Sequence, residues 1–124
     1  MPGQLPQRWV ARTQEHIVVT INYRMNIMGF PNAAGTREQN LGLLDQRVAL
    51  EWVRDNIRYF GGDPSKIMIW GQSAGAAAVD YHNYAYWDDP IAHAMFAQSG
   101  SVFLYQAGSP GMDWTHTNFT FVAK

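Results

Sequence analysis

The 124-residue sequence contains no cysteine, which excludes disulfide scaffolds, thiolate zinc sites and cysteine nucleophiles. It also lacks a long hydrophobic run, since apolar stretches such as 67–70 are far shorter than the roughly 20 residues that a membrane-spanning helix needs. The first residues show neither the charged region nor the apolar core of a signal peptide. We therefore expect neither a membrane-spanning segment nor a signal peptide in this sequence.

An excess of charge of one sign is lacking as well. Ten acidic and nine basic residues give a net charge of −1, with no basic cluster. Nucleic acid and anionic membrane surfaces are therefore not expected as partners. Charged residues make up only 15% of the chain and hydrophobic residues 47%, a composition that argues against intrinsic disorder. The length allows one domain.

Short apolar runs that alternate with helical patterns predict the α/β class. Runs rich in β-branched or apolar residues predict buried strands at Ile17–Tyr23, Ile67–Trp70 and Ala94–Gln98. Apolar residues at helical spacing predict a helix over Leu43–Phe60, and the alanines of Ala76–Val79 favour a second helix after the second strand. This order is typical of a parallel sheet whose strands are joined by crossover helices.

The remaining segments show no regular spacing of apolar residues. Residues 1–16 are expected to be an irregular lead-in, 17–102 to form the α/β domain, and 103–124 to continue it irregularly. The segment 23–42 is rich in glycine, proline and asparagine, which predicts a long loop. Four aromatic residues fall on the predicted core faces and are expected to pack inside: Trp52, Phe60, Trp70 and Phe96.

A G-x-S-x-G motif, Gly71-Gln72-Ser73-Ala74-Gly75, lies between a predicted strand and a predicted helix. This is the setting of a nucleophile elbow, in which a strained turn exposes the serine hydroxyl. We expect Gly71 and Gly75 to remove Cβ atoms that would clash where strand and helix meet. Ser73 is the candidate nucleophile, and the backbone N–H of Ala74 is a candidate oxyanion donor. The alternative is a small-residue turn that only links strand to helix.

The sequence around this motif resembles the type-B carboxylesterase/lipase family, which includes the cholinesterases. The resemblance runs from Phe60-Gly61-Gly62-Asp63-Pro64 through the predicted strand to Gly75, and further segments extend it over roughly residues 17–102. It implies a partial α/β-hydrolase fold and serine-dependent hydrolysis of a small-molecule carboxylic ester through an acyl-enzyme. No metal or organic cofactor is implied.

The acid and histidine of the catalytic triad are not expected in this sequence. In the α/β-hydrolase fold they follow the serine on loops after later strands, but only 124 − 73 = 51 residues follow Ser73. Asp113 and His116 are three residues apart, too close to come from separate strand ends. Residues 1–16 contain only Gly3, whereas the family has a glycine-rich oxyanion loop before the first predicted strand. We expect an internal fragment that is inactive alone.

Several residues outside the nucleophile and oxyanion positions have supporting or structural roles as their expected functions. Gln72 could orient the floor of the site or be structural, and Ser99, at the end of a predicted strand, could support the triad by a hydrogen bond or form a turn. Arg24 and Asp45 match family positions and are expected to fix the long loop. Five possible metal ligands show no ligand spacing and are expected to form a solvated helix end and loop: Asp80, His82, Asp88, Asp89 and His93.

The sequence leaves two alternatives to a hydrolase open. One is a non-catalytic cholinesterase-like binding or adhesion module, although members of that group typically lose the serine that is present here as Ser73. The other is an inactive truncation product. The Asn118-Phe119-Thr120 sequon is expected by chance in a chain of this composition. Secretion is implied only by the family, and the oligomeric state is not determined by the sequence.

Overall fold

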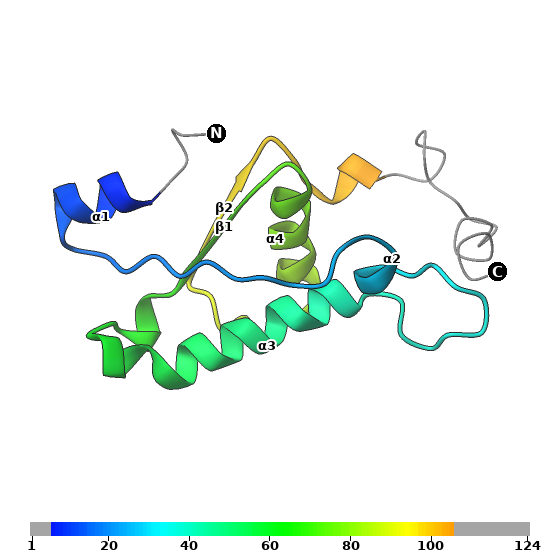
Figure 1. The fold of residues 1–124 in the computed structure, drawn as a ribbon, viewed down its shortest axis with the longest axis horizontal. Coiled ribbons are helices and arrows are strands. Elements are labelled where there is room, and N and C mark those ends of the chain that lie inside the picture. Colours follow the sequence, from blue (N-terminus) through cyan, green and yellow to red (C-terminus); the bar gives the residue numbers. More distant parts are fainter. Residues whose placement is uncertain (1–5, 106–124) are drawn as a thin grey trace.

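The computed structural model describes residues 6–105. Two parallel strands, β1 and β2, lie against helix α4, and the long helix α3 packs beside them (Figure 1). The strands are β1 (Met68–Gln72) and β2 (Ala94–Gln98), and the α-helices are α1 (Gln7–Thr13), α2 (Asn26–Gly29), α3 (Leu41–Asn56) and α4 (Ala74–Ala85). Three short 3-10 helices complete the described part: η2 (Ile57–Phe60), η3 (Pro64–Lys66) and η4 (Val102–Tyr105).

The sheet confirms two of the predicted strands and their parallel pairing. Met68 lies opposite Ala94, and the register continues to Gln72 opposite Gln98. Helix α4 makes the crossover between them, and its buried face begins with the small side chains of Ala76, Ala77 and Ala78 and continues with Val79 and His82. These small side chains let the helix approach the strands closely. Because the strands are parallel, the residues that follow them lie at one edge of the sheet.

Helix α3 confirms the predicted helix after the long loop, and its last predicted turn is the 3-10 helix η2. The chain then reverses at Gly61, whose φ of 81° is a left-handed conformation that glycine adopts without strain. Side chains of α3 pack against a small core formed by residues before and between the strands. That core consists of Ile67, Ile91 and Ala92, with Leu50 and Val53 of α3 packed against it.

The predicted strand at Ile17–Tyr23 is wrong. The segment is extended, but its backbone groups form no hydrogen bond with any residue that the structure describes. A β-branched run favours an extended chain, whereas a strand also needs a neighbouring edge with which to pair. The beginning of the supposed irregular lead-in differs as well, because Gln7–Thr13 forms helix α1.

The four aromatic residues expected in the core are not buried. Trp52, Phe60 and Phe96 are each more than half exposed, and Trp70 is 38% exposed. Helix α4 covers one face of the sheet, whereas on the other face Trp70 contacts Trp9 of α1 in a stack with 4.9 Å between ring centroids. Apart from this contact with α1, no described helix covers that second face, so its large side chains stay in contact with solvent.

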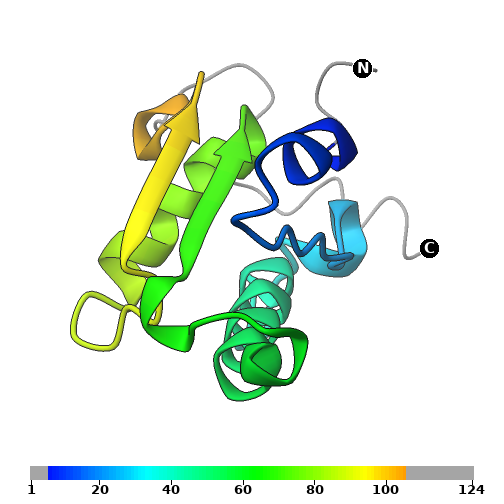
Figure 2. The ribbon, with the colours of Figure 1, turned by 90° about the vertical axis from the view of Figure 1, so that its left-hand side faces the viewer.

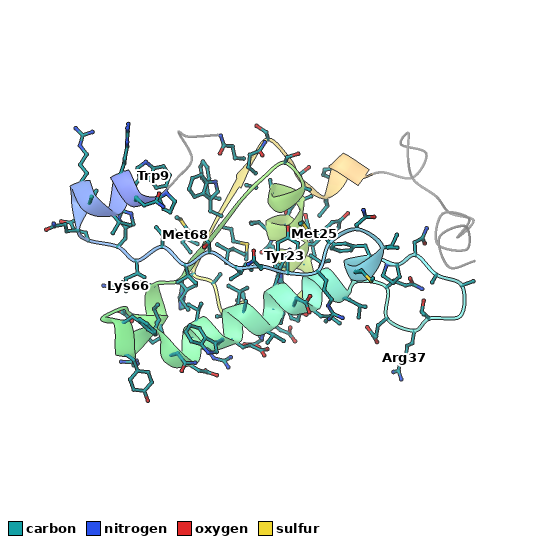
Figure 3. All side chains as sticks on the ribbon, in the orientation of Figure 1. Trp9, Tyr23, Met25, Arg37, Lys66 and Met68 are labelled. Atoms are coloured by element: carbon teal, nitrogen blue, oxygen red, sulfur yellow. The ribbon has the colours of Figure 1, made fainter. Side chains whose placement is uncertain are left out.

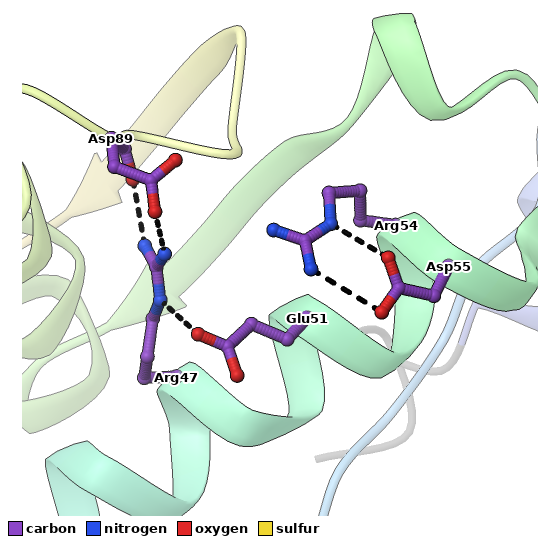
Figure 4. A network of polar contacts seen from close by, with 5 residues as sticks. All are labelled: Arg47, Glu51, Arg54, Asp55 and Asp89. Atoms are coloured by element: carbon purple, nitrogen blue, oxygen red, sulfur yellow. Dashed lines mark hydrogen bonds and ion pairs between the residues drawn. The ribbon is translucent and has the colours of Figure 1, made fainter.

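Arg47 ties α3 to the loop between α4 and β2 (Figure 4). Its guanidinium donates to Glu51 at 2.8 Å, to the Asp89 carbonyl at 2.7 Å, and to the Asp89 carboxylate. The same group lies over the Tyr86 ring, 4.3 Å from its centroid. The sequence predicts that Asp89 belongs to a solvated loop. In the structure Asp89 takes part in a tertiary contact instead.

A second ion pair fixes the long loop, as expected from the sequence. Arg24 donates to both carboxylate oxygens of Asp45, at 2.8 and 2.7 Å, and its backbone N–H adds a third bond at 3.0 Å. This pairing holds the pKa of Asp45 down at about 2. None of the helices in the described part has the length and apolar composition that crossing a bilayer requires.

Candidate active site

Ser73 lies in the turn between β1 and α4, as the sequence predicts. Its φ of 55° and ψ of −118° form a strained conformation for a residue with a side chain. The residue is exposed, and its hydroxyl does not cap the helix that follows. The hydroxyl is therefore held at the carboxyl edge of the sheet without an internal hydrogen bond to any described residue.

An added Cβ atom would clash at only one of the two glycines of the motif. A Cβ added to Gly71 would lie 2.8 Å from Ala76 N and closer still to the carbonyl of Gly75. Real Cβ atoms essentially never come within 3.0 Å of such atoms, so the approach of α4 to β1 requires glycine here. A Cβ added to Gly75 would meet no described atom within 4 Å. The expectation of a clash is thus confirmed for Gly71 and wrong for Gly75.

The N-terminus of α4 begins directly after Ser73. Its first residue, Ala74, has a backbone N–H without an acceptor among the described residues, while Ala76 and Ala77 bond to the Ser73 carbonyl. The N-terminus of a 12-residue helix carries a partial positive charge. Negative charge that develops beside Ser73 would therefore meet both a free donor and a favourable dipole.

The end of β2 and the residues after it contact the same turn. The Ser73 N–H donates to the Gln98 carbonyl at 2.9 Å, which ties the turn to the end of the neighbouring strand. Ser99 follows with a φ of 57°, a second strained non-glycine residue at this edge. A Cβ added to Gly100 would lie 3.1 Å from Ala76 Cβ. Gln72, the last residue of β1, is exposed.

No described histidine forms a hydrogen bond with Ser73. His16 contacts Thr13 near α1, and His93 lies before β2, at the opposite end of the sheet. His82 is nine residues beyond Ser73 on α4, which separates the two by about 13 Å along a helix axis. The possible pair Asp113 and His116 lies outside the described residues. Ser73 and Ala74 are thus brought together without a base among residues 6–105.

His82 is buried, so the prediction that it belongs to a solvated helix end is wrong. Its Nε2 lies 3.1 Å from Gln46 Oε1 of α3, its ring stacks on Tyr86, and its Nδ1 is buried without a partner in the described structure. Burial, followed by the nearby Arg47 charge, lowers the pKa of His82 below its usual 6.5. No local pattern could have predicted the contact with Gln46, because the two residues are 36 positions apart.

Comparison with known proteins identifies the family. The sequence profile described as "Carboxylesterase family" matches residues 3–118, which is nearly the whole chain. The chain belongs to the carboxylesterase family. The structure of this family member is consistent with a partial α/β-hydrolase fold, with a small parallel sheet, a crossover helix and the serine turn.

Individual relatives agree with this assignment. The chain is 55% identical over 121 residues to "Chlorogenic acid esterase" of Aspergillus niger, a match that covers 98% of this chain and 23% of the relative. It is 50% identical over 128 residues to "Secreted lipase 5" of Gibberella zeae, which covers 100% of this chain and 24% of the relative. With "Acetylcholinesterase" of Gallus gallus it shares 43% identity over 109 residues, covering 86% of this chain and 13% of the relative. This carboxylesterase-family chain therefore spans about a quarter of the length of its first two relatives.

Proposed function

We propose that this chain is the nucleophile-bearing part of a serine-dependent carboxylic ester hydrolase. The observation that supports this most directly is the strained, exposed Ser73 between β1 and α4, with no internal partner for its hydroxyl in the described part. In this mechanism Ser73 Oγ attacks the ester carbonyl as its proton passes to a base. The alcohol leaves, and water then releases the acid from the acyl-enzyme.

The surroundings of Ser73 supply the other parts of the proposal. The Ala74 N–H donates to the oxyanion of the tetrahedral intermediate, and the dipole of α4 stabilises the same charge. Gly71 permits the helix to lie close enough for this geometry. Ser99 and Gln72 have supporting roles at the edge where β1 and β2 end. The chemistry requires water and no cofactor.

We further propose that the acid and the base come from other parts of a longer polypeptide. None of His16, His82 and His93 forms a hydrogen bond with Ser73 in the described structure, so residues 6–105 show no base paired with the serine. An alcohol without a base is a weak nucleophile at neutral pH. The substrate class is carboxylic esters; the names of the relatives include a chlorogenic acid esterase and a lipase, and no acyl or alcohol group is assigned to this chain.

The test places this chain in the Aspergillus niger esterase in exchange for the matched stretch. A fluorophosphonate probe should label Ser73, and Ser73→Ala should lower kcat for a short-chain nitrophenyl ester by about 10⁶-fold. Ser65→Ala is the matched control, because Ser65 lies in η3 before β1 and contacts Asp63. Labelling at another residue would contradict the assignment, and a folded chimera with no labelling would favour a non-catalytic module.

The isolated 124-residue chain provides a second test. It should show no ester turnover that depends on Ser73, since we propose that the base comes from another part of a longer polypeptide. Turnover that is abolished by Ser73→Ala and by a change at His82, His93 or His116 would show that this chain contains its own base. The proposal that the base lies elsewhere would then be wrong.

A further inference from the structure

Gly100 lies directly against the serine turn, two residues beyond the end of β2. Figure 2 shows β1 and β2 ending at the same edge of the sheet, with η4 beside the end of β2. A Cβ added to Gly100 would come within 3.0 Å of the Ser73 carbonyl oxygen and would lie 3.2 Å from the carbonyl carbon. Real Cβ atoms essentially never come within 3.0 Å of a backbone atom. The Ser73 backbone therefore occupies the space in which a side chain at position 100 would lie.

This contact, and not the backbone conformation, is what requires glycine at position 100. Gly35 and Gly61 are the described glycines with a positive φ, and Gly100 is not among them. The backbone at position 100 therefore does not need the left-handed conformation that glycine adopts without strain. A side chain there is opposed by its clash with the serine turn.

Two hydrogen bonds hold residue 100 in this position. On one side, the Ser73 N–H donates to the Gln98 carbonyl at 2.9 Å. On the other side, the Val102 N–H donates to the Asp80 carboxylate of α4, also at 2.9 Å. The short segment between these two anchors cannot move away from α4 without breaking one of them. A clash at position 100 is therefore transmitted to Ser73 and is not relieved by the segment itself.

The Ser73 carbonyl belongs to the same peptide group as the Ala74 N–H. This peptide is planar and trans, so its C=O and N–H point in opposite directions and turn together. The carbonyl oxygen accepts from the backbone N–H groups of Ala76 and Ala77, at 2.9 and 3.1 Å, which directs the Ala74 N–H out of the N-terminus of α4. A displacement of the carbonyl oxygen therefore also turns the Ala74 N–H.

We propose that Gly100 is a positioning residue for the oxyanion donor, because its lack of a side chain lets the Ser73–Ala74 peptide direct the Ala74 N–H at the developing negative charge. This inference rests on the proposed function of Ser73 and Ala74. Ordinary contact begins at 3.4 Å, so in Gly100→Ala the new Cβ and the Ser73 oxygen must separate by more than 3.4 − 3.0 = 0.4 Å. Hydrogen bonds weaken steeply as their angle departs from linear, so the resulting rotation weakens the bond to the oxyanion.

Kinetics of Gly100→Ala in the chimera with the Aspergillus niger esterase test this proposal. For the short-chain nitrophenyl ester, kcat should fall on the order of 100-fold with KM unchanged, because one oxyanion donor contributes about 10²–10³ in kcat. The affinity for a trifluoromethyl ketone, which forms an oxyanion when Ser73 adds to it, should fall by the same factor. A role in stability alone would change neither kcat nor this affinity in a folded variant.

Gly62→Ala is the matched control, since it also adds one methyl group that clashes with backbone. Its Cβ would lie 3.2 Å from the Ile57 carbonyl oxygen. Gly62 precedes η3, and Figure 3 shows Lys66 of η3 and Met68 at the beginning of β1, the end of the strand opposite the serine turn. This control should lower the free energy of unfolding and leave kcat unchanged.

Asp80→Ala provides a second test, because it removes one of the two anchors that hold residue 100 against the turn. In Gly100→Ala/Asp80→Ala the segment after β2 can retreat, so kcat should recover on the order of tenfold relative to Gly100→Ala. The double variant should nevertheless unfold at a lower temperature, since it has lost a hydrogen bond. A kcat that does not recover would overturn the proposal.

The outcomes separate this proposal from the proposed function. Turnover that depends on Ser73 in the unmodified chimera supports the proposed function, whatever the result with Gly100→Ala. When that turnover is present, a kcat of folded Gly100→Ala equal to that of Gly62→Ala overturns the positioning role alone. If the unmodified chimera folds without such turnover, both proposals are wrong. If Gly100→Ala does not fold, the double variant is compared with Asp80→Ala, and equal kcat values overturn the positioning role.

Discussion

The two glycines of the serine turn should respond in opposite ways to the same added methyl group. In Gly71→Ala, the new Cβ would lie 2.8 Å from Ala76 N, whereas ordinary contact begins at 3.4 Å. The backbone of α4 must therefore move by at least 3.4 − 2.8 = 0.6 Å, and by more at the Gly75 carbonyl. In Gly75→Ala, the Cβ meets no described atom within 4 Å.

The expected magnitudes follow from these geometries. Overpacking costs about 1–3 kcal/mol, and the upper end applies to Gly71→Ala because backbone atoms cannot rotate away as a side chain can. Alanine in place of glycine inside a helix gains about 0.5–1 kcal/mol, which applies to Gly75→Ala in α4. The two variants should thus differ by about 4 kcal/mol in free energy of unfolding, on the order of 10³-fold in the equilibrium constant.

Urea titration followed by tryptophan fluorescence measures this difference, since Trp70 lies on β1 next to Gly71. With an m-value of about 2 kcal/mol per molar, the midpoints of the two variants should lie about 2 M apart, with Gly71→Ala below the unmodified chain. Equal midpoints, or a lower midpoint for Gly75→Ala, would refute the inference that Gly71 alone is sterically required. Unchanged m-values would show that the unfolded states are comparable.

The other predictions concern strain and titration. Ser73→Gly should raise the free energy of unfolding by about 1 kcal/mol, because glycine adopts the positive φ without strain. Ser73→Ala should leave the free energy of unfolding without this gain. If both variants changed it equally, the backbone at position 73 would not be strained. Arg24 lowers the pKa of Asp45 to about 2. The unmodified chain should therefore have a higher Tm than Asp45→Asn above pH 4, and this difference should disappear as the pH falls toward 2. A difference in Tm that persists at pH 2 would contradict the stabilising role of the ion pair. The pKa of His82 is lowered by burial and by Arg47, so its neutral form should stabilise the fold above pH 6.5 and lose that effect as the pH falls. If the Tm of His82→Gln fell between pH 7 and 5 by as much as the Tm of the unmodified chain, this prediction would be contradicted.

The sequence by itself determined the local elements and the serine turn. Helical spacing predicted α3, apolar runs predicted β1 and β2, and the G-x-S-x-G spacing placed Ser73 between strand and helix. These features depend on residues close together in the chain, where local backbone preference and side-chain periodicity operate. The requirement for glycine at position 71 also follows from that local geometry.

Only the tertiary structure decided which extended segments pair and which side chains are buried. Ile17–Tyr23 has a strand composition but no hydrogen-bonded neighbour in the described part, and Phe96 is exposed because no described layer covers that face of the sheet. The contacts of Arg47 with Asp89 and of His82 with Gln46 join residues 42 and 36 positions apart. Such pairings depend on how elements pack in three dimensions, which periodicity along one segment does not encode.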